Sequence, residues 1–378
     1  MIGTAQRLRD SVASGDTLAR IGGDDFVVVL ETLDSNIETA KAEADTVATH
    51  ILASLNRPYQ IDQQEIRCAA SIGIALADQG QISIEELLKQ ADIGLYQAKT
   101  SGRNQICFFD PAMAQTVTRQ AQLANALHSA VQDQQFELYY QIQVDDQNRP
   151  VGAEALIRWE HPQLGLVSPN DFIPLAEASD TILPIGLWVL DSACAQLKSW
   201  QSDPHTCWLS IAINISPRQF HQADFVDSVL QAIGRWDISP GSIKLELTET
   251  VILDNTNETI EKMYQLKRAG VEFALDDFGT GYSSLSYLTQ LPLSQLKMDQ
   301  SFVRKIGIKE SDDIIVQTIL AMAKSLAIKV IAEGVETEAQ RSFLAKLGCP
   351  LFQGYLFGKP VPIAEFEKLL LSHLNKAE

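Results

Sequence analysis

The stretch FELYYQIQVDDQNRPVGAEALIRW, residues 136–159, decides the architecture of most of this chain. It holds two apolar, strand-like runs, Phe136–Gln143 and Val151–Arg158, and only the turn-like residues 144–150 separate them. A crossover between parallel strands needs a dozen or more residues. We therefore expect these two strands to pair antiparallel.

Further strand-like runs follow, and helical segments separate most of them. Strands that alternate with helices over about 250 residues are typical of an eight-stranded α/β barrel. The predicted fold is a modified TIM (β/α)8 barrel with an antiparallel first strand pair. The later strands are predicted at 208–215, 243–248, 271–276, 295–299, 329–333 and 351–356, and the helices at 171–200, 257–268, 312–325 and 338–347.

The residues before the barrel mix strands and helices in an order that indicates an α+β domain. Strands are predicted at 26–30, 66–75 and 106–109, and helices at 37–55 and 84–99. Residues 110–134 are rich in Ala, Gln and Leu, which suits a helix. We predict a partial α+β domain over 1–109, a connecting helix over 110–121 and the barrel domain over 122–378.

Composition narrows the class of protein. The 378 residues carry a net charge of −18, which argues against a nucleic acid polymer or a membrane surface as partner, because either needs a basic patch. The five cysteines include no CxxC pair, so we expect reduced thiols and a cytoplasmic protein. We find neither an apolar run of about 18 residues nor the apolar core of a signal peptide.

Polar side chains stand at the end of each predicted barrel strand. In α/β barrels the active site lies at the carboxyl ends of the strands, so these groups are expected to surround one pocket. They are Gln141, Glu154 with Arg158, Asn214, Glu246 with Glu249, Asp276 with Asp277, Lys297 with Asp299, Glu333, and Gln353.

These residue types indicate a metal site. Carboxylates with one Asn carbonyl form an oxygen-rich set that suits Mg²⁺ or Mn²⁺ rather than zinc. Clustered acids repel one another unless cations lie between them. Two ions roughly 4 Å apart would activate water and stabilise the attacking and leaving oxygens. They would also give an acidic protein the positive potential that an anionic substrate requires.

Each residue taken singly also has a structural explanation. Asp277 could cap the turn that follows it, Lys297 could pair with Asp299, and Arg158 could extend its charged head from the barrel rim into water. The glycine-containing loop after Asp277 is either an ordinary connection or one that positions this carboxylate and gates the site. The joint pattern of all the strand ends favours the functional interpretation.

The barrel block resembles the EAL domain, the family of c-di-GMP phosphodiesterases. The motifs that carry the resemblance are EALIRW from Glu154, NISPRQF from Asn214, LELTET from Leu245, DDFGTGYSSLSYL from Asp276, KMDQSF from Lys297, EGVET from Glu333 and QGYLFGKP from Gln353. The resemblance implies hydrolysis of c-di-GMP to pGpG by water, assisted by two Mg²⁺ or Mn²⁺ ions, in a homodimer formed through this domain. The alternative is a receptor that binds c-di-GMP without turnover.

The resemblance also implies roles for single positions. Lys297 would be the catalytic lysine, either as a base with a lowered pKa or by stabilising charge. Glu249 would anchor the loop that follows Asp277. The implied metal ligands are Glu154, Asn214, Glu246, Asp276, Asp277 and Glu333, of which Glu154 and Glu333 also count as catalytic; the implied substrate contacts are Gln141, Arg158 and Gln353.

The first block resembles the later part of a GGDEF domain, the diguanylate cyclase family. The motifs are ARIGGDDFVVVL from Ala19, SIGIA from Ser71 and ADIGLYQAKTSGRNQI from Ala91. The chain begins just before the GGDD hairpin, Asp25 stands in the fourth position of the signature in place of Glu, and Ala13 stands where the inhibitory RxxD pattern needs Arg. We therefore expect no cyclase activity, GTP binding at most, and a sheet with open edges that packs poorly or depends on a partner.

Overall fold

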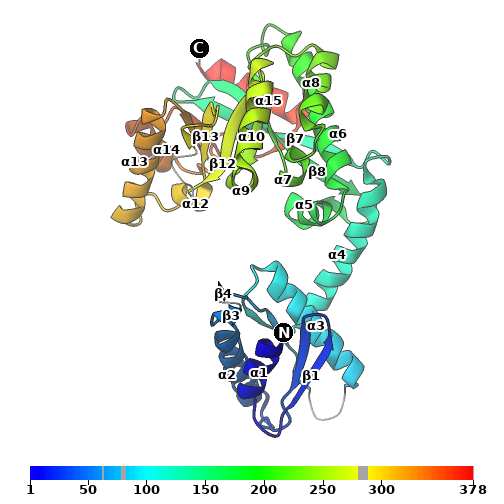
Figure 1. The fold of residues 1–378 in the computed structure, drawn as a ribbon. Helices are drawn as coiled ribbons and strands as arrows, with labels where there is room; N and C mark the ends of the chain where they lie inside the picture. Colours follow the sequence, from blue (N-terminus) through cyan, green and yellow to red (C-terminus); the bar gives the residue numbers. More distant parts are fainter. Residues whose placement is uncertain (62–63, 78–81, 280–287, 378) are drawn as a thin grey trace. The chain divides into compact units, whose positions relative to one another are not determined.

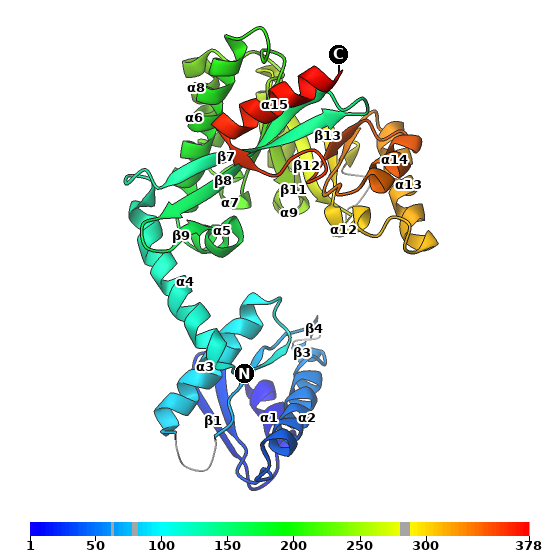
Figure 2. The ribbon, with the colours of Figure 1, turned by 180° about the vertical axis from the view of Figure 1, so that it is seen from behind.

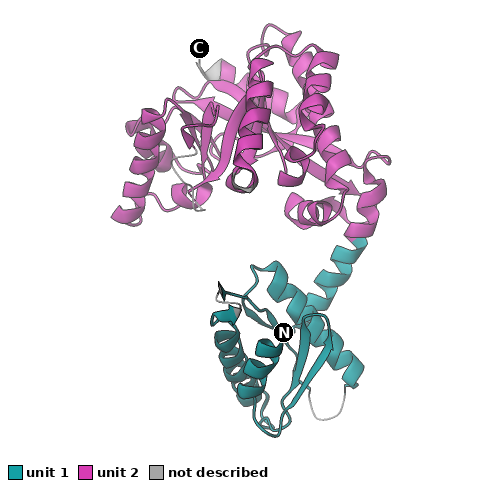
Figure 3. Cartoon of the chain, viewed as in Figure 1, with its two compact units in different colours: residues 1–122 teal, residues 123–378 magenta. Residues whose placement is uncertain are grey.

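The structure, a computed structural model, describes residues 1–61, 64–77, 82–279 and 288–377. The chain forms two compact units, residues 1–122 and 123–378 (Figure 3). The boundary falls inside helix α4 (Pro111–Ala130), so the predicted connecting helix is the first part of a longer helix.

Unit 2 is a closed barrel of eight strands among the described residues. Neighbouring strands follow the order β7, β8, β10, β11, β12, β13, β14, β15, and β15 pairs with β7 again. Strand β7 runs antiparallel to both of its barrel neighbours, and the other neighbouring pairs are parallel, which confirms the predicted modified barrel. The strands are β7 (Phe136–Asp145), β8 (Pro150–His161), β10 (Ser210–Asn214), β11 (Ile243–Thr248), β12 (Glu272–Phe278), β13 (Gln295–Met298), β14 (Lys329–Ala332) and β15 (Leu351–Gln353), with β9 (Gly165–Val167) and β16 (Val361–Pro362) at the edges.

Helices surround the barrel, and α15 packs across β7 (Figures 1 and 2). One predicted helix was wrong, because 171–200 is two helices. The Ser179 hydroxyl bonds to the carbonyls of Leu175 and Ala176 and ends the first of them. The helices are α5 (Pro169–Ala178), α6 (Ile182–Gln201), α7 (Pro217–Phe220), α8 (Phe225–Trp236), α9 (Glu249–Asp254), α10 (Thr256–Arg268), α12 (Gln300–Val303), α13 (Glu310–Ser325), α14 (Glu338–Lys346) and α15 (Ile363–Ala377).

Alternation along the barrel strands separates the core from the site. In β11, Ile243, Leu245 and Leu247 are buried in the hydrophobic core that the strands share with the helices. Successive side chains of a strand point to opposite faces. Lys244 and Glu246 therefore point into the barrel, and the same alternation applies to the other parallel strands. The apolar layer thus holds the strands in register while the inner layer is left for polar groups.

The described residues of unit 1 form three separate two-stranded sheets. The predicted strand 66–75 was wrong, because its ends belong to β4 and β5, which pair with different partners. The hairpin of β1 and β2 carries the GGDD turn. The elements are α1 (Ile2–Asp10), β1 (Thr17–Gly22), β2 (Asp25–Val29), α2 (Ile37–Leu55), β3 (Tyr59–Ile61), β4 (Gln64–Ile66), β5 (Ile72–Ile74), α3 (Ile84–Thr100) and β6 (Ile106–Phe108).

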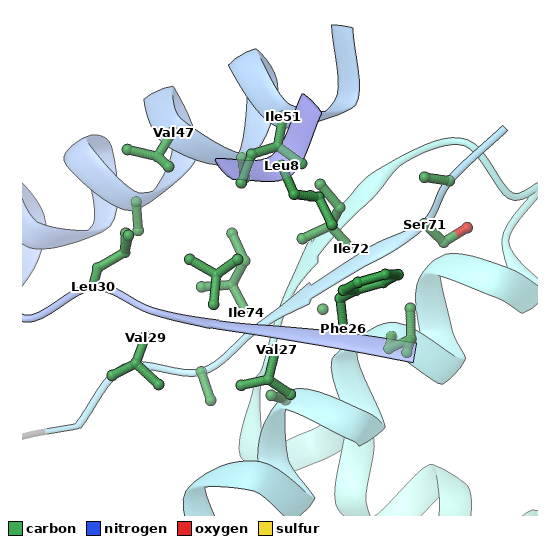
Figure 4. A pocket seen from close by; sticks show the side chains of 18 of the residues that line it. Leu8, Phe26, Val27, Val29, Leu30, Val47, Ile51, Ser71, Ile72 and Ile74 are labelled. Carbon is green, nitrogen blue, oxygen red and sulfur yellow. The ribbon is translucent and has the colours of Figure 1, made fainter. Parts of the chain in front are cut away.

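A large apolar cavity lies along the strands of unit 1 (Figure 4). Its volume is about 1730 Å³, and every residue of 26–30 and 71–77 lines it. Because successive side chains alternate between faces, a cavity that every residue lines must run along a strand edge. Among the described residues β2 pairs only with β1, and β5 only with β6. The expected open edges are therefore present and face this cavity.

Two predictions from composition can be compared with the structure. All five cysteines are free, as predicted. Among the described residues no helix is both long enough and apolar enough to cross a membrane.

We expect the open edge of β5 to exchange its amide hydrogens fast. The Ile72 N–H donates to the Gln105 carbonyl at 3.0 Å, which leaves the Gly73 N–H on the opposite edge. In hydrogen exchange followed by NMR, Gly73 should lose protection well before Ile72 and before the amides of β11, after correction for intrinsic rates. Equal protection of Gly73 and Ile72 would show that this edge is closed.

Candidate active site

The ammonium of Lys297 is the centre of a cluster of carboxylates inside the barrel. Its Nζ lies 2.5 Å from Glu246 Oε2, 2.8 Å from Glu333 Oε1, 3.1 Å from Asp276 Oδ1 and 3.4 Å from Glu154 Oε1. The Lys297 side chain is only 2% exposed. Four carboxylates that are far apart in the sequence therefore meet around one buried cation.

Strand register brings these groups together. Glu246 on β11 is paired with Asn214 on β10, and Asp276 on β12 is paired with Thr248. All of these strands are parallel, so their carboxyl ends meet at one mouth of the barrel. Glu333 directly follows the end of β14, and its N–H donates to the Met298 carbonyl. The site predicted from the strand ends is thus assembled in space.

Hydrogen bonds hold the Glu154 carboxylate on both of its oxygens. Asn214 Nδ2 donates to Oε1 at 2.6 Å, and Gln353 Nε2 donates to Oε2 at 2.6 Å. Burial pushes the pKa of Glu154 upward, but the Lys297 ammonium and these two donors outweigh it and hold the pKa below its ordinary value. Glu154 is therefore kept ionised.

The pKa values of two other carboxylates, Glu246 and Glu333, are raised rather than lowered. Burial, together with the neighbouring acids, raises the pKa of Glu246 well above its ordinary value despite Lys297. Burial and the nearby Asp276 and Glu154 likewise raise the pKa of Glu333 to about 8. The cluster therefore holds more negative charge than one ammonium balances.

The pKa of Lys297 is raised and not lowered. Burial alone would lower it, but the surrounding carboxylates Glu154, Glu246, Glu333 and Asp276 raise it well above its ordinary value. In the ion-free protein, the pKa of Lys297 is therefore not the lowered one that the role of a base would need.

The donor set suits additional cations. If all four carboxylates were ionised, Lys297 would leave three negative charges without a counter-charge. Glu246 Oε1 is buried and has no hydrogen-bond partner among the described residues. Hard oxygen donors of this kind match Mg²⁺ or Mn²⁺. In the described part of the chain, no group of three or more His, Cys, Asp or Glu side chains has the geometry to hold a metal ion as the side chains stand.

Asp277 and Glu249 lie at the start of the loop that follows β12. Asp277 adopts a left-handed backbone with φ of 53°, which is uncommon outside glycine, and its N–H donates to Asp276 Oδ1 at 2.9 Å. Glu249 Oε1 accepts from the Gly279 N–H at 3.3 Å, the contact expected of a loop anchor. The rest of the loop, 280–287, lies outside the described residues, so its predicted gating stays a prediction.

The predicted substrate contacts occupy the side of the barrel formed by β7, β8 and β15. Gln141 Oε1 accepts from Gln353 Nε2 at 3.0 Å. Arg158 lies on β8 with its guanidinium 5.3 Å from the centre of the Tyr139 ring, and burial lowers the pKa of this guanidinium. Asp299 instead caps α12, because its carboxylate accepts from the Ser301 N–H.

Sequence reasoning missed Gln143. This side chain is 2% exposed and donates from Nε2 to Gln353 Oε1 at 2.9 Å. Its spacing of two from Gln141, which puts both on one face of a strand, was the available signal.

Comparison with known proteins assigns this chain to a family. The sequence model of the EAL domain matches residues 124–360, more than half of the chain. The chain belongs to the EAL domain family. Residues 1–105 match the model described as diguanylate cyclase, GGDEF domain. The motifs on which the resemblance was based therefore lead to the families predicted from them.

Curated relatives match nearly the whole chain. The bifunctional diguanylate cyclase/cyclic di-GMP phosphodiesterase MucR of Pseudomonas aeruginosa is 43% identical over 98% of this chain and 53% of its own length. The cyclic di-GMP phosphodiesterase NbdA of the same organism is 37% identical over 98% of this chain and 46% of its own length. The chain thus spans about half the length of these relatives.

Solved structures of EAL proteins match the barrel. A MucR phosphodiesterase in complex with c-di-GMP is 44% identical, with a TM-score of 0.63, and covers 65% of this chain and 99% of its own. The EAL enzyme Bd1971, bound to cAMP and cyclic-di-GMP, is 36% identical, with a TM-score of 0.65 and 77% coverage of both chains.

We expect the substitution Lys297→Met to destabilise the EAL barrel when divalent ions are removed with a chelator. Removing one partner from a buried ion pair typically costs about 3–5 kcal/mol, and here it leaves four carboxylates without a cation. The loss in the free energy of unfolding should become smaller as the pH falls, because Glu246 and Glu333, whose pKa values are raised, then bind protons and the uncompensated negative charge decreases.

Urea unfolding followed by tryptophan fluorescence measures this loss. The signal reports unit 2 alone, since all five tryptophans lie there: Trp159, Trp188, Trp200, Trp208 and Trp236. Lys198→Met is the matched control, because Lys198 pairs with Asp237 at the surface, where an ion pair contributes at most about 1 kcal/mol. Equal stability of the two variants would contradict the central role of Lys297.

Proposed function

We propose that the EAL unit hydrolyses c-di-GMP to pGpG. The observation that carries the proposal is the convergence of Glu154, Glu246, Asp276 and Glu333 on Lys297 at the carboxyl ends of the barrel strands. The likeness to a MucR phosphodiesterase in complex with c-di-GMP, at 44% identity, supports the choice of substrate. The named activities of MucR and NbdA support it as well.

The residues that would hold the divalent ions surround the Lys297 ammonium. When bound, Mg²⁺ or Mn²⁺ would lower the pKa of the attacking water and neutralise charge on the phosphodiester. We propose two ions. The proposed ligands are Glu154, Asn214, Glu246, Asp276, Asp277 and Glu333.

The protein's own groups have separate tasks in this proposal. Lys297, whose pKa the surrounding carboxylates raise, would stabilise negative charge that develops on the phosphate oxygens as water adds and a ribose oxygen leaves. Gln353 and Gln141 present amide groups at the barrel mouth, and Arg158 supplies a fixed positive charge there for the second phosphate or a base. Glu154 and Glu333 would act as ligands of the ions.

We propose that unit 1 makes no c-di-GMP. Asp24 and Asp25 lie at an exposed hairpin, with Gly23 forming its turn at φ of 49°. The open strand edges along the unit 1 cavity leave this sheet in separate pieces. A regulatory role through GTP is the remaining possibility for this unit.

The purified 378-residue chain with c-di-GMP and Mg²⁺ or Mn²⁺ should release pGpG, which anion-exchange chromatography detects. Glu154→Gln should lose at least about 100-fold in rate, because it removes a proposed ligand, whereas groups that only orient ligands typically account for about 10–100-fold. Glu367→Gln, an exposed acid on α15, is the control and should leave the rate unchanged.

The pGpG assay together with calorimetry separates the alternatives. If calorimetry shows binding of c-di-GMP and chromatography shows no pGpG, the phosphodiesterase proposal is refuted and a receptor is supported. GTP supplied in place of c-di-GMP should give no product, and formation of c-di-GMP, or of the pGpG to which the EAL unit would convert it, would refute the inactivity of unit 1.

We also propose a homodimer formed through the EAL unit, in the cytoplasm. Five free thiols suit a reducing compartment. Ile308, Ile314 and Ile315 lie in or just before α13 with 69%, 54% and 41% of their surface exposed, an apolar patch that a second copy would cover.

Sedimentation equilibrium tests the dimer. The chain should sediment as a dimer, and Ile314→Asp should shift it toward the monomer. Ile37→Asp alters an isoleucine of unit 1 with a similar exposure of 52% and should have no effect. A monomeric wild-type chain would refute the dimer.

A further inference from the structure

Three glutamines form a continuous chain of hydrogen bonds inside the barrel, where the reversed strand β7 meets its neighbours. Register places Gln143 of β7 opposite Gln353 of β15, and Gln141 of β7 opposite Glu154 of β8. Gln143 Nε2 donates to Gln353 Oε1 at 2.9 Å, and Gln353 Nε2 donates to both Gln141 Oε1 at 3.0 Å and Glu154 Oε2 at 2.6 Å. Gln143 donates to none of the clustered carboxylates through these bonds. It is linked to Glu154 through the Gln353 amide.

The chemistry of the end groups fixes the direction of every bond in this chain. The ionised Glu154 carboxylate only accepts hydrogen bonds, so the Gln353 group that faces it must be the NH₂. The Gln353 carbonyl oxygen must then face Gln143, which has to donate. At the other branch, Gln141 Nε2 donates to the Gly358 carbonyl at 3.2 Å, which turns its own oxygen toward Gln353. One orientation of each amide therefore satisfies the whole set.

The environment makes a reversed amide costly. Gln143, Gln353 and Glu154 are 2%, 4% and 5% exposed, so water does not replace a lost partner. If Gln353 turned over, its carbonyl oxygen would face the carboxylate of Glu154, and two acceptors would oppose each other. The end of β15 is held beside Val335, because the Val335 N–H donates to the Gln353 carbonyl at 3.1 Å and Gly354 passes so close that a Cβ would lie 2.2 Å from the Val335 carbonyl oxygen.

We propose that Gln143 is a positioning residue, which acts through the Gln353 amide to orient the Glu154 carboxylate for the divalent ion. The inference rests on the proposed function of the same site, since Glu154 is one of the proposed metal ligands. Gln143 acts as a donor: it occupies the Gln353 oxygen and so keeps the Gln353 NH₂ on Glu154. Groups that orient metal ligands in this way typically account for about 10–100-fold in metal affinity or activity.

Gln143→Glu tests the donor while keeping the shape of the side chain. Burial raises the pKa of the introduced carboxyl group, so the comparison is made at a pH high enough to ionise it. The ionised group cannot donate to Gln353 Oε1, so Gln353 loses its orienting partner. We expect the Mn²⁺ concentration for half-maximal binding, measured by electron paramagnetic resonance, to rise about 10–100-fold, and kcat for c-di-GMP to fall by a similar factor. Gln135→Glu is the matched control, because Gln135 accepts from Trp159 Nε1, a task that a carboxylate oxygen performs equally well.

A second variant and a change of pH separate positioning from simple damage to the fold. Gln143→Met keeps the volume and places no charge, and it should show the same weakened Mn²⁺ binding. Lowering the pH should reduce the difference in Mn²⁺ affinity between Gln143→Glu and the wild type, because the introduced carboxyl group regains an O–H donor when it is protonated. For Gln143→Met, the difference in Mn²⁺ affinity from the wild type should stay the same when the pH is lowered.

The test of Gln143 can fail or succeed independently of the proposed phosphodiesterase activity. If the wild type binds Mn²⁺ but releases no pGpG, the phosphodiesterase assignment fails while the Mn²⁺ titrations still decide the role of Gln143. Mn²⁺ binding by Gln143→Glu and Gln143→Met that equals that of Gln135→Glu would overturn the proposal, as would equal loss in both variants without recovery of Gln143→Glu at lower pH.

Discussion

The ammonium of Lys297, buried among four carboxylates, is the interaction on which the described site depends. Several acids would not share one buried space without a cation, because their mutual repulsion in a poorly solvated interior exceeds what hydrogen bonds return. One lysine offsets part of this repulsion and leaves an excess of negative charge. That excess makes the barrel mouth suitable for divalent ions, which would supply the positive potential that the proposed anionic substrate requires in a protein with a net charge of −18.

The reversed strand β7 has a second consequence beyond closing the barrel. It contributes Gln141 and Gln143 from a strand that runs opposite to its neighbours, so both amides point inward beside Gln353 and Glu154. Strand β7 therefore contributes two neutral amides to the pocket, whereas the charged groups come from the other strands and from Glu333 after β14. An amide chain next to a charged cluster orients carboxylates without adding to the charge that the lysine and the ions have to balance.

The two units differ in how completely their sheets are paired. Every strand of the barrel itself has a partner on each side, so no backbone edge is left open in the described barrel strands. In unit 1 the pairs β1–β2 and β5–β6 face a common apolar cavity of about 1730 Å³. That difference, more than the identity of the GGDD residues, makes the barrel the well-packed part of this chain.

The sequence by itself determined the barrel, its antiparallel first pair and the polar strand ends, because strand alternation and a short connection between residues 143 and 151 are local properties. It also placed Glu154, Glu246, Asp276 and Glu333 among the groups expected at one mouth, since parallel strands end on the same side of the barrel. Only the tertiary structure decided that α5 and α6 are separate helices, that Asp299 caps α12, that the pKa of Lys297 is raised and that Gln143 belongs to the site. The break at Ser179 and the cap at Asp299 are local contacts that the periodicity of the sequence does not reveal. The pKa of Lys297 and the place of Gln143 depend on distances between side chains from different strands, and register and burial set those distances only after the barrel has closed.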